Sequence, residues 1–134
     1  MAITCTDEKN LSPNEFIDAL ERSTLARRRP VDDLERIKTM IAHADIMLCA
    51  RDGEKLVGIS RALTDFSYCC YLSDLAVDTA NHKTGVGKEL VYRTRGIAGD
   101  RAKFFLMSVP DTMTYYEHIG MTAIPNGWMI DRVG

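Results

Sequence analysis

The chain has 134 residues, of which 46% are apolar and 27% are charged, a composition typical of a folded domain with its own hydrophobic core. Its net charge of −2 excludes a general electrostatic attraction to nucleic acid or to anionic lipid, so we expect neither partner. The first residues lack the pattern of a secretion signal, and no apolar run reaches membrane-spanning length. We therefore expect a cytoplasmic protein with one domain over residues 1–134.

The four cysteines are Cys5, Cys49, Cys69 and Cys70. No pair has the spacing of a metal finger and no histidine cluster accompanies them, so we expect no metal site. Cys69 and Cys70 are adjacent in a strand-like run, which should point their side chains to opposite faces. We interpret all four as small apolar residues of a reducing compartment.

The N-terminal segment predicts a short strand over residues 3–6 and a helix that begins after Ser12. Ser12 can cap the helix, Pro13 suits its first position, and Glu15 completes a capping box. Leu11 and Phe16 have the spacing of the hydrophobic staple that accompanies such a box.

A basic run, Arg27-Arg28-Arg29, separates this helix from a second one predicted over residues 32–44. Asp32 and Glu35 are placed as the capping pair of the second helix. The basic run could bind the 3′-phosphate of a nucleotide or an acidic acceptor, but such a run is more often a solvated loop, and we interpret it so.

The middle of the chain predicts an antiparallel meander of three strands. Residues 46–51 and 56–63 form the first two, joined at Asp52-Gly53, which is a strong hairpin signal. A second turn at residues 65–67 leads into a long, largely apolar strand over residues 68–77.

The last third predicts an amphipathic helix after a Gly-rich turn, then a strand over residues 104–109 and a short helix over residues 112–118. One or two closing strands are expected between Met121 and Asp131. The predicted order is β-α-α-β-β-β-α-β-α-β, which is a mixed α+β domain.

The Gly-rich turn, residues 84–88, places backbone N–H groups at a helix N-terminus, which favours a phosphate group. A β-carbon at Gly85 or Gly87 would obstruct the close approach of that phosphate. A Walker-type loop fails because Glu89 stands where the hydroxyl residue should be, and a dinucleotide fingerprint fails at Leu90. Coenzyme A remains as a ligand class, beside the alternative that glycine only turns the chain here.

Four segments together resemble the GNAT superfamily of N-acetyltransferases in order and spacing. They are residues 56–65, 71–78, 82–87 and 115–121. The resemblance implies an acyl-coenzyme A N-acyltransferase fold, with a mostly antiparallel central sheet that contains a splayed strand pair and is flanked by helices. The family's loop usually begins with Arg or Gln, where this chain has His82.

The resemblance implies acetyl-coenzyme A as co-substrate, with its pyrophosphate on the amides of the Gly-rich turn and its pantetheine arm on the backbone of the preceding strand. A main-chain N–H at the splayed end of that strand would bind the acyl carbonyl. The implied cofactor-binding residues are Leu75, Ala76, Val77, His82, Lys83, Thr84, Gly85, Val86, Gly87 and Lys88.

Tyr116 matches the tyrosine that the family uses to protonate the departing thiolate, although Tyr115 and Tyr116 could also be core aromatics. The base that takes the amine proton is open between Asp74, Glu117, His118 and a chain of waters. Asp74 lies in the apolar strand, and a carboxylate buried in apolar surroundings has a raised pKa. We therefore list Tyr116 and Asp74 as catalytic candidates.

The resemblance implies direct transfer of an acetyl group to a primary amine in a ternary complex, since no nucleophile–base arrangement supports an acyl-enzyme. The acceptor is a small-molecule amine or a peptide amine, and a homodimer is compatible with the family. One alternative is a regulatory module that binds coenzyme A without transfer. Another is a protein for a different phosphate ligand.

Overall fold

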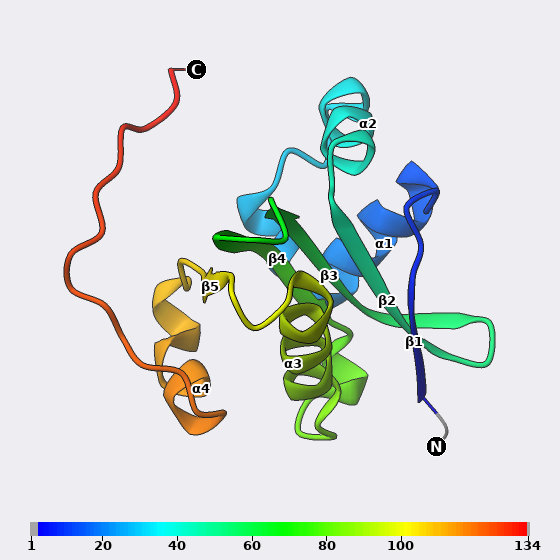
Figure 1. The fold of residues 1–134 in the computed structure, drawn as a ribbon. Helices are drawn as coiled ribbons and strands as arrows, with labels where there is room; N and C mark the ends of the chain where they lie inside the picture. Colours follow the sequence, from blue (N-terminus) through cyan, green and yellow to red (C-terminus); the bar gives the residue numbers. More distant parts are fainter. Residues whose placement is uncertain (1–2, 134) are drawn as a thin grey trace.

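The computed structural model describes residues 3–133, which form a five-stranded sheet with helices on both faces (Figure 1). The strand order is β1-β2-β3-β4-β5; the first three pairs are antiparallel, and β4 with β5 is parallel. The strands are β1 (Ile3–Asp7), β2 (Ile46–Asp52), β3 (Lys55–Thr64), β4 (Cys69–Val77) and β5 (Lys103–Phe105). The α+β class predicted from the sequence is confirmed.

The α-helices are α1 (Pro13–Ser23), α2 (Leu34–Ala42), α3 (Val86–Ala98) and α4 (Met113–His118). Short 3-10 turns are η1 (Leu25–Arg28), η2 (Thr79–Asn81) and η3 (Pro110–Thr112). No helix among residues 3–133 combines the length and the apolar character that a membrane crossing requires.

The N-terminus of α1 forms as its sequence predicts. The Ser12 hydroxyl accepts the Glu15 backbone N–H at 3.1 Å, and Leu11 and Phe16 are both buried. The Glu15 carboxylate instead binds Arg51, at 3.0 Å, so only the Ser12 half of the predicted capping box forms. The N-cap of α2 is Asp33 and not the predicted Asp32, because the Asp33 carboxylate accepts the N–H of Arg36.

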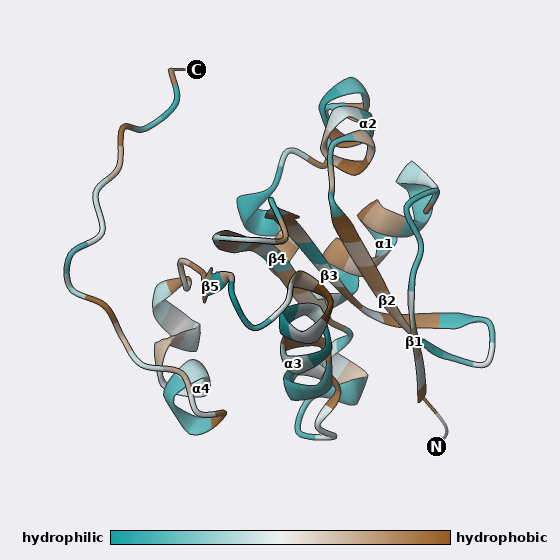
Figure 2. Ribbon diagram, in the orientation of Figure 1, coloured by the Kyte–Doolittle hydropathy of each residue, from teal (hydrophilic) through white to brown (hydrophobic). Residues whose placement is uncertain are grey.

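Two apolar layers hold the helices to the sheet (Figure 2). Phe16 and Leu20 of α1 pack with Ile37 of α2 on one face. Val86 and Leu90 of α3 pack on the other face. The sheet therefore has an apolar core on each face, and the site described below lies among the loops at its edge.

A β-bulge in β4 changes which way its side chains point. Arg61 of β3 pairs with Asp74, whereas the next β3 residue pairs with Leu72, which leaves Ser73 without a partner. Before the bulge Leu72 packs against α3, and after it Ala76 packs on the α1 face. The extra residue therefore turns Asp74 toward α1 and η1.

The C-terminal part differs from the prediction in two ways. The strand expected over residues 104–109 is only Lys103–Phe105, and residues 121–131 form no strand. The segment extends away from the sheet (Figure 1), and Trp128 and Ile130 are 97% and 100% exposed. The prediction rested on apolar, β-favouring side chains, but a strand also needs a backbone partner, which this segment does not have in the structure.

Candidate coenzyme A and acceptor site

The turn between β4 and α3 presents a helix N-terminus at the edge of the sheet. The helix begins after Gly85, whose carbonyl accepts the first helical bond, from the N–H of Glu89 at 3.0 Å. The N–H groups of the first turn of an α-helix have no partners within the helix. They and the helix dipole make this end suited to a phosphate group. The predicted turn residues are thus brought together at one helix end.

The two glycines of this turn are required for different reasons. Gly85 has φ of +88° with open space around it, so glycine serves the left-handed backbone conformation. At Gly87, a β-carbon would collide with the hydroxyl of Tyr115 on α4. Backbone geometry at Gly85 and contact with α4 at Gly87 thus favour glycine even without a ligand, and the role of these glycines in making room for a phosphate stays a prediction.

His82, where the family usually has Arg or Gln, folds back onto the strand. Its Nε2 lies 2.9 Å from the carbonyl oxygen of Val77, so that nitrogen donates to the end of β4. The neighbouring Lys83 has φ of +67°, and the Thr84 hydroxyl donates to the carbonyl of Asn81 at 2.5 Å. The turn is shaped by its own contacts before any ligand binds.

Strands β4 and β5 part beside this turn. Their pairing ends at Tyr71 with Phe105, whose rings stack with centroids 5.3 Å apart, whereas β4 continues to Val77. Leu75 to Val77 pair with β3 on one side only. Apart from the Val77 carbonyl, which His82 already binds, the other side of the β4 backbone can therefore hydrogen-bond an extended ligand, and it leads to the N-terminus of α3.

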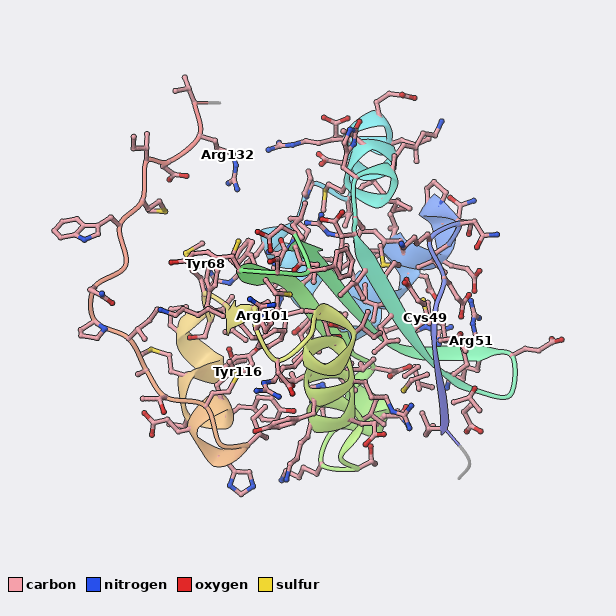
Figure 3. The ribbon with its side chains drawn as sticks, in the orientation of Figure 1. Cys49, Arg51, Tyr68, Arg101, Tyr116 and Arg132 are labelled. Atoms are coloured by element: carbon pink, nitrogen blue, oxygen red, sulfur yellow. The ribbon has the colours of Figure 1, made fainter. Side chains whose placement is uncertain are left out.

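The two tyrosines of α4 lie against each other with ring centroids 5.2 Å apart, in an edge-to-face arrangement. Burial, reinforced by the nearby Tyr115, raises the pKa of Tyr116 to about 12, and the positive charge of Arg29 acts in the opposite direction. Burial also raises the pKa of Tyr115. Tyr116 (Figure 3) is therefore a protonated phenol at neutral pH.

Asp74 is 1% exposed and forms ion pairs with the Nε atoms of both Arg29 and Arg61. Both of its oxygens are engaged. This arrangement argues against the base role considered from the sequence, because the carboxylate is shielded from solvent and its two acceptor oxygens already bind two cations. The other two candidate side chains, Glu117 and His118, are exposed on α4.

The two arginines also bind the bulge in β4. Nη2 of Arg29 donates to the Ser73 carbonyl at 2.8 Å, and Nη2 of Arg61 donates to the Ser73 hydroxyl at 2.9 Å. Sequence reasoning missed this cluster. Arg61 could have indicated it, because it is a single charged residue among the apolar residues in the middle of β3 and a buried charge needs a partner.

A cavity of about 520 Å³ opens beside this cluster, between η1, α2 and the point where the strands part. Tyr71 and Ser73 of β4 line one side, and Met107 and Val109, which follow β5, line another. The remaining lining is mostly basic: Arg28, Arg29, Arg36, Arg61 and Arg132.

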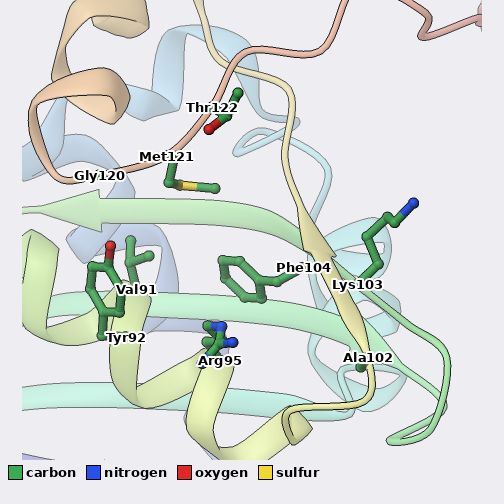
Figure 4. A pocket seen from close by; sticks show the side chains of 9 residues that line it. All are labelled: Val91, Tyr92, Arg95, Ala102, Lys103, Phe104, Gly120, Met121 and Thr122. Carbon is green, nitrogen blue, oxygen red and sulfur yellow. The ribbon is translucent and has the colours of Figure 1, made fainter.

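A second cavity, of about 370 Å³, lies between α3, β5 and the start of the C-terminal segment (Figure 4). Val91, Phe104 and Met121 line it together with the polar ends of Tyr92 and Arg95. None of the residues predicted to bind coenzyme A or to act in catalysis lines this cavity. Among residues 3–133 no cluster of His, Cys, Asp and Glu is suited to a metal ion.

Strands that part beside a helix N-terminus fit the class of acyl-coenzyme A-dependent N-acyltransferases, and Tyr116 adds a half-buried phenol. The comparison with protein families gives the same answer: the model described as Acetyltransferase (GNAT) family matches residues 14–121. The chain belongs to the GNAT acetyltransferase family.

Solved structures share the fold at low sequence identity. A GNAT family acetyltransferase from Streptococcus pneumoniae has a TM-score of 0.80 at 15% identity, covering 99% of this chain and 98% of that one. A protein described as a transcriptional regulator from Bacillus halodurans has 0.76 at 20%, covering 98% and 100%. An aminoglycoside acetyltransferase from an uncultured soil sample, in complex with sisomicin, has 0.70 at 18%, covering 98% and 95%. No curated protein matches in sequence.

Proposed function

We propose that this protein transfers an acetyl group from acetyl-coenzyme A to a primary amine, directly between the two bound substrates. The observation that carries the proposal is the continuation of β4 to Val77 beyond its last pairing with β5, next to the N-terminus of α3. The backbone of β4 can hydrogen-bond the extended arm of coenzyme A, and the N-terminus of α3, which follows it, can bind the diphosphate.

The residues present fit coenzyme A. The N–H groups of Val86, Gly87 and Lys88 would hold its pyrophosphate, together with the turn from His82 to Gly85. The open side of β4, from Leu75 to Val77, would hold the pantetheine arm. When bound, acetyl-coenzyme A supplies a thioester whose carbonyl carbon an amine can attack.

Main-chain N–H groups on the open side of β4 are the proposed donors to the acyl oxygen. Such donors act best where water is excluded, and each contributes about 2.7–4 kcal/mol to lowering a barrier when it is aimed at developing negative charge. The bulge at Ser73 fixes the direction of this backbone, and the buried Arg29–Asp74–Arg61 cluster holds the bulge in place. We therefore assign Asp74 a positioning role.

Tyr116 is the proposed acid. As the N–C bond forms and the C–S bond breaks, the departing sulphur needs a proton, and a phenol with a pKa of about 12 is protonated and able to donate at neutral pH. The charge of Arg29 favours the phenolate that would form. We assign no side chain as the base: the acceptor first loses one proton to water and attacks as the neutral amine. The proton that its nitrogen loses as the amide forms passes through water to the Tyr116 phenolate, which restores the phenol.

A second candidate function is a regulatory module that binds coenzyme A without transfer. It is favoured by the likeness to the protein described as a transcriptional regulator and by the two ion pairs of Asp74, which leave the base unassigned. We propose a reducing cytoplasm as the compartment, where the buried thiols of Cys49 and Cys70 would stay free.

The test has two steps. Calorimetry with acetyl-coenzyme A measures binding, and release of free thiol in the presence of a panel of amines measures transfer. Saturable binding with amine-dependent thiol release supports the enzyme; binding without release from any amine supports the regulatory module. No binding at millimolar ligand would rule out both.

A further inference from the structure

The cavity beside the parted strands, of about 520 Å³, is surrounded by positive charge although the whole chain has a net charge of −2. Five arginines line it: Arg28, Arg29, Arg36, Arg61 and Arg132. The family assignment does not require this feature. The interpretation of the basic run as a solvated loop does not hold for Arg29, which is ion-paired with Asp74, whereas Arg28 is exposed and lines the cavity.

The arginines outnumber the carboxylates that could neutralise them. Arg29 and Arg61 share the single carboxylate of Asp74. Among the side chains that the structure describes, none forms an ion pair with the guanidinium groups of Arg28 and Arg36, and the cavity lining contains no acid. Glu35, the nearest acid in sequence to Arg36, pairs with Lys38, and Asp33 accepts the backbone N–H of Arg36. The cavity thus has excess positive charge around it.

The positive charges around the cavity repel each other, and an anion bound among them offsets that repulsion. Guanidinium groups also match carboxylate and phosphate oxygens in geometry, with two parallel hydrogen bonds for each pair. An acceptor with several ammonium groups, such as an aminoglycoside, would meet repulsion in the same place. The charge therefore selects the chemical class of the acceptor.

The cavity also lies where an acceptor must approach. Tyr71 and Ser73 of β4 and Met107 after β5 line it, so it opens onto the two strands that separate. Arg29, which lines the cavity, also carries a charge that lowers the pKa of Tyr116. An anionic group held by Arg28 and Arg36 would leave the rest of a small molecule free to extend toward the parted strands.

We infer that the acceptor is an amine that also carries an anionic group, a carboxylate or a phosphate, and that Arg28 and Arg36 bind this group. The inference rests on the proposed function, since it names the substrate class of the same site.

The first experiment compares pairs of acceptors in which only one member carries an anionic group. Thiol release is measured with α-amino acids against their α-amides, and with phosphoethanolamine against ethanolamine. We expect kcat/KM to be at least about tenfold higher for the anionic member of a pair, the size expected for a charged hydrogen bond. The first pair reports a carboxylate site and the second a phosphate site. Equal values within both pairs, or a preference for polyamines, would overturn the inference.

The second experiment uses matched variants of the basic run. Arg28→Gln and Arg36→Gln should each raise KM for the anionic acceptor about tenfold and leave the Kd of acetyl-coenzyme A unchanged. Arg27→Gln is the control, because Arg27 is exposed and does not line the cavity. All three side chains are exposed, so we expect unchanged thermal unfolding. An equal rise in KM in Arg27→Gln would show that general surface charge attracts the acceptor, and it would contradict a specific site.

A binding readout separates the two proposals. Calorimetry titrates the preferred anionic amine into the protein with and without coenzyme A. Binding that Arg28→Gln weakens and Arg27→Gln does not supports the inference independently of turnover. If acetyl-coenzyme A is consumed but anionic amines neither bind nor react better, the inference fails and the proposed function stands. If no amine supports thiol release, the proposed function fails, and the assignment of this cavity to an acceptor fails with it.

Discussion

The hydroxyl of Tyr115 occupies the space that a β-carbon on Gly87 would need. The close contact between α4 and the start of α3 therefore requires glycine at position 87. This contact places α4, and with it Tyr116, beside the turn proposed to bind the pyrophosphate. The position of the proposed acid therefore depends on a glycine in the phosphate-binding turn, which links the two halves of the site physically.

Replacing Gly87 with Ala should lower the free energy of unfolding by about 1–3 kcal/mol, because the new methyl group forces Tyr115 to move. Removing the hydroxyl in the double variant Gly87→Ala with Tyr115→Phe should restore most of that loss. Urea unfolding measures both. Gly96→Ala, in the same helix with open space around the site, should instead stabilise by about 0.5–1 kcal/mol. A Gly87→Ala protein as stable as the parent would show that the contact does not constrain α4.

Replacing Tyr116 with Phe should lower kcat by about 10²–10⁴-fold, the range for a lost general acid, and leave the Kd of coenzyme A within about twofold. Because the pKa of Tyr116 is about 12, the parent should show no loss of kcat from this phenol between pH 7 and 10. Tyr68→Phe is the control, since Tyr68 is 79% exposed. An unchanged kcat in the Tyr116 variant would remove the assignment of this residue as the acid.

Replacing Asp74 with Asn should lower the free energy of unfolding by roughly 3–5 kcal/mol, because the buried Arg61 and the half-buried Arg29 lose their shared counter-charge. Asp32→Asn, at an exposed position, should change stability by less than about 0.5 kcal/mol. Urea unfolding is measured beside kcat for each variant. A stable Asp74→Asn protein that has lost only kcat would support the base role that the structure argues against.

The ion pair between Glu8 and Arg51 should make stability depend on pH. Two hydrogen bonds, both at 2.8 Å from Arg51 Nε and Nη2, hold the pKa of Glu8 below its ordinary value of 4.5. A carboxylate whose pKa is lower in the folded state contributes stability above its unfolded pKa and loses it as pH falls through the folded pKa. The parent should therefore lose stability more steeply below pH of about 4.5 than Glu8→Gln.

At pH 7, Glu8→Gln should be less stable than the parent by roughly 1 kcal/mol, a value for a well-formed pair that is still partly exposed. Unfolding in urea at several pH values measures the difference. Glu54→Gln, which removes an exposed carboxylate, is the matched control. Parallel curves for the parent and Glu8→Gln would contradict the lowered pKa.

Several elements could be predicted from the sequence because neighbouring residues determine them. Ser12 caps the helix whose N–H groups lie next to it in the chain, and Gly53, with φ of +63°, makes the hairpin after Asp52. The Gly-rich turn and the helix after it form within one short stretch. The sequence pattern also indicated the family before any coordinates, since its motifs are short and come in a defined order.

Other features depend on contacts between distant residues. Arg29 and Asp74 are 45 positions apart and meet only because a bulge at Ser73 turns Asp74 toward η1. The C-terminal segment shows the reverse case: its apolar pattern suits a strand, but residues 121–133 form none in the structure.

The sequence by itself determined most local elements and the family, and it predicted a phosphate site at the Gly-rich turn, because each depends on residues close together in the chain. Only the tertiary structure decided that Asp74 is buried as a shared counter-ion and that arginines from η1, α2 and β3 surround one cavity. These charged residues are far apart in the sequence and interact through space. The net charge around the cavity is therefore known only once the sheet and its helices are assembled.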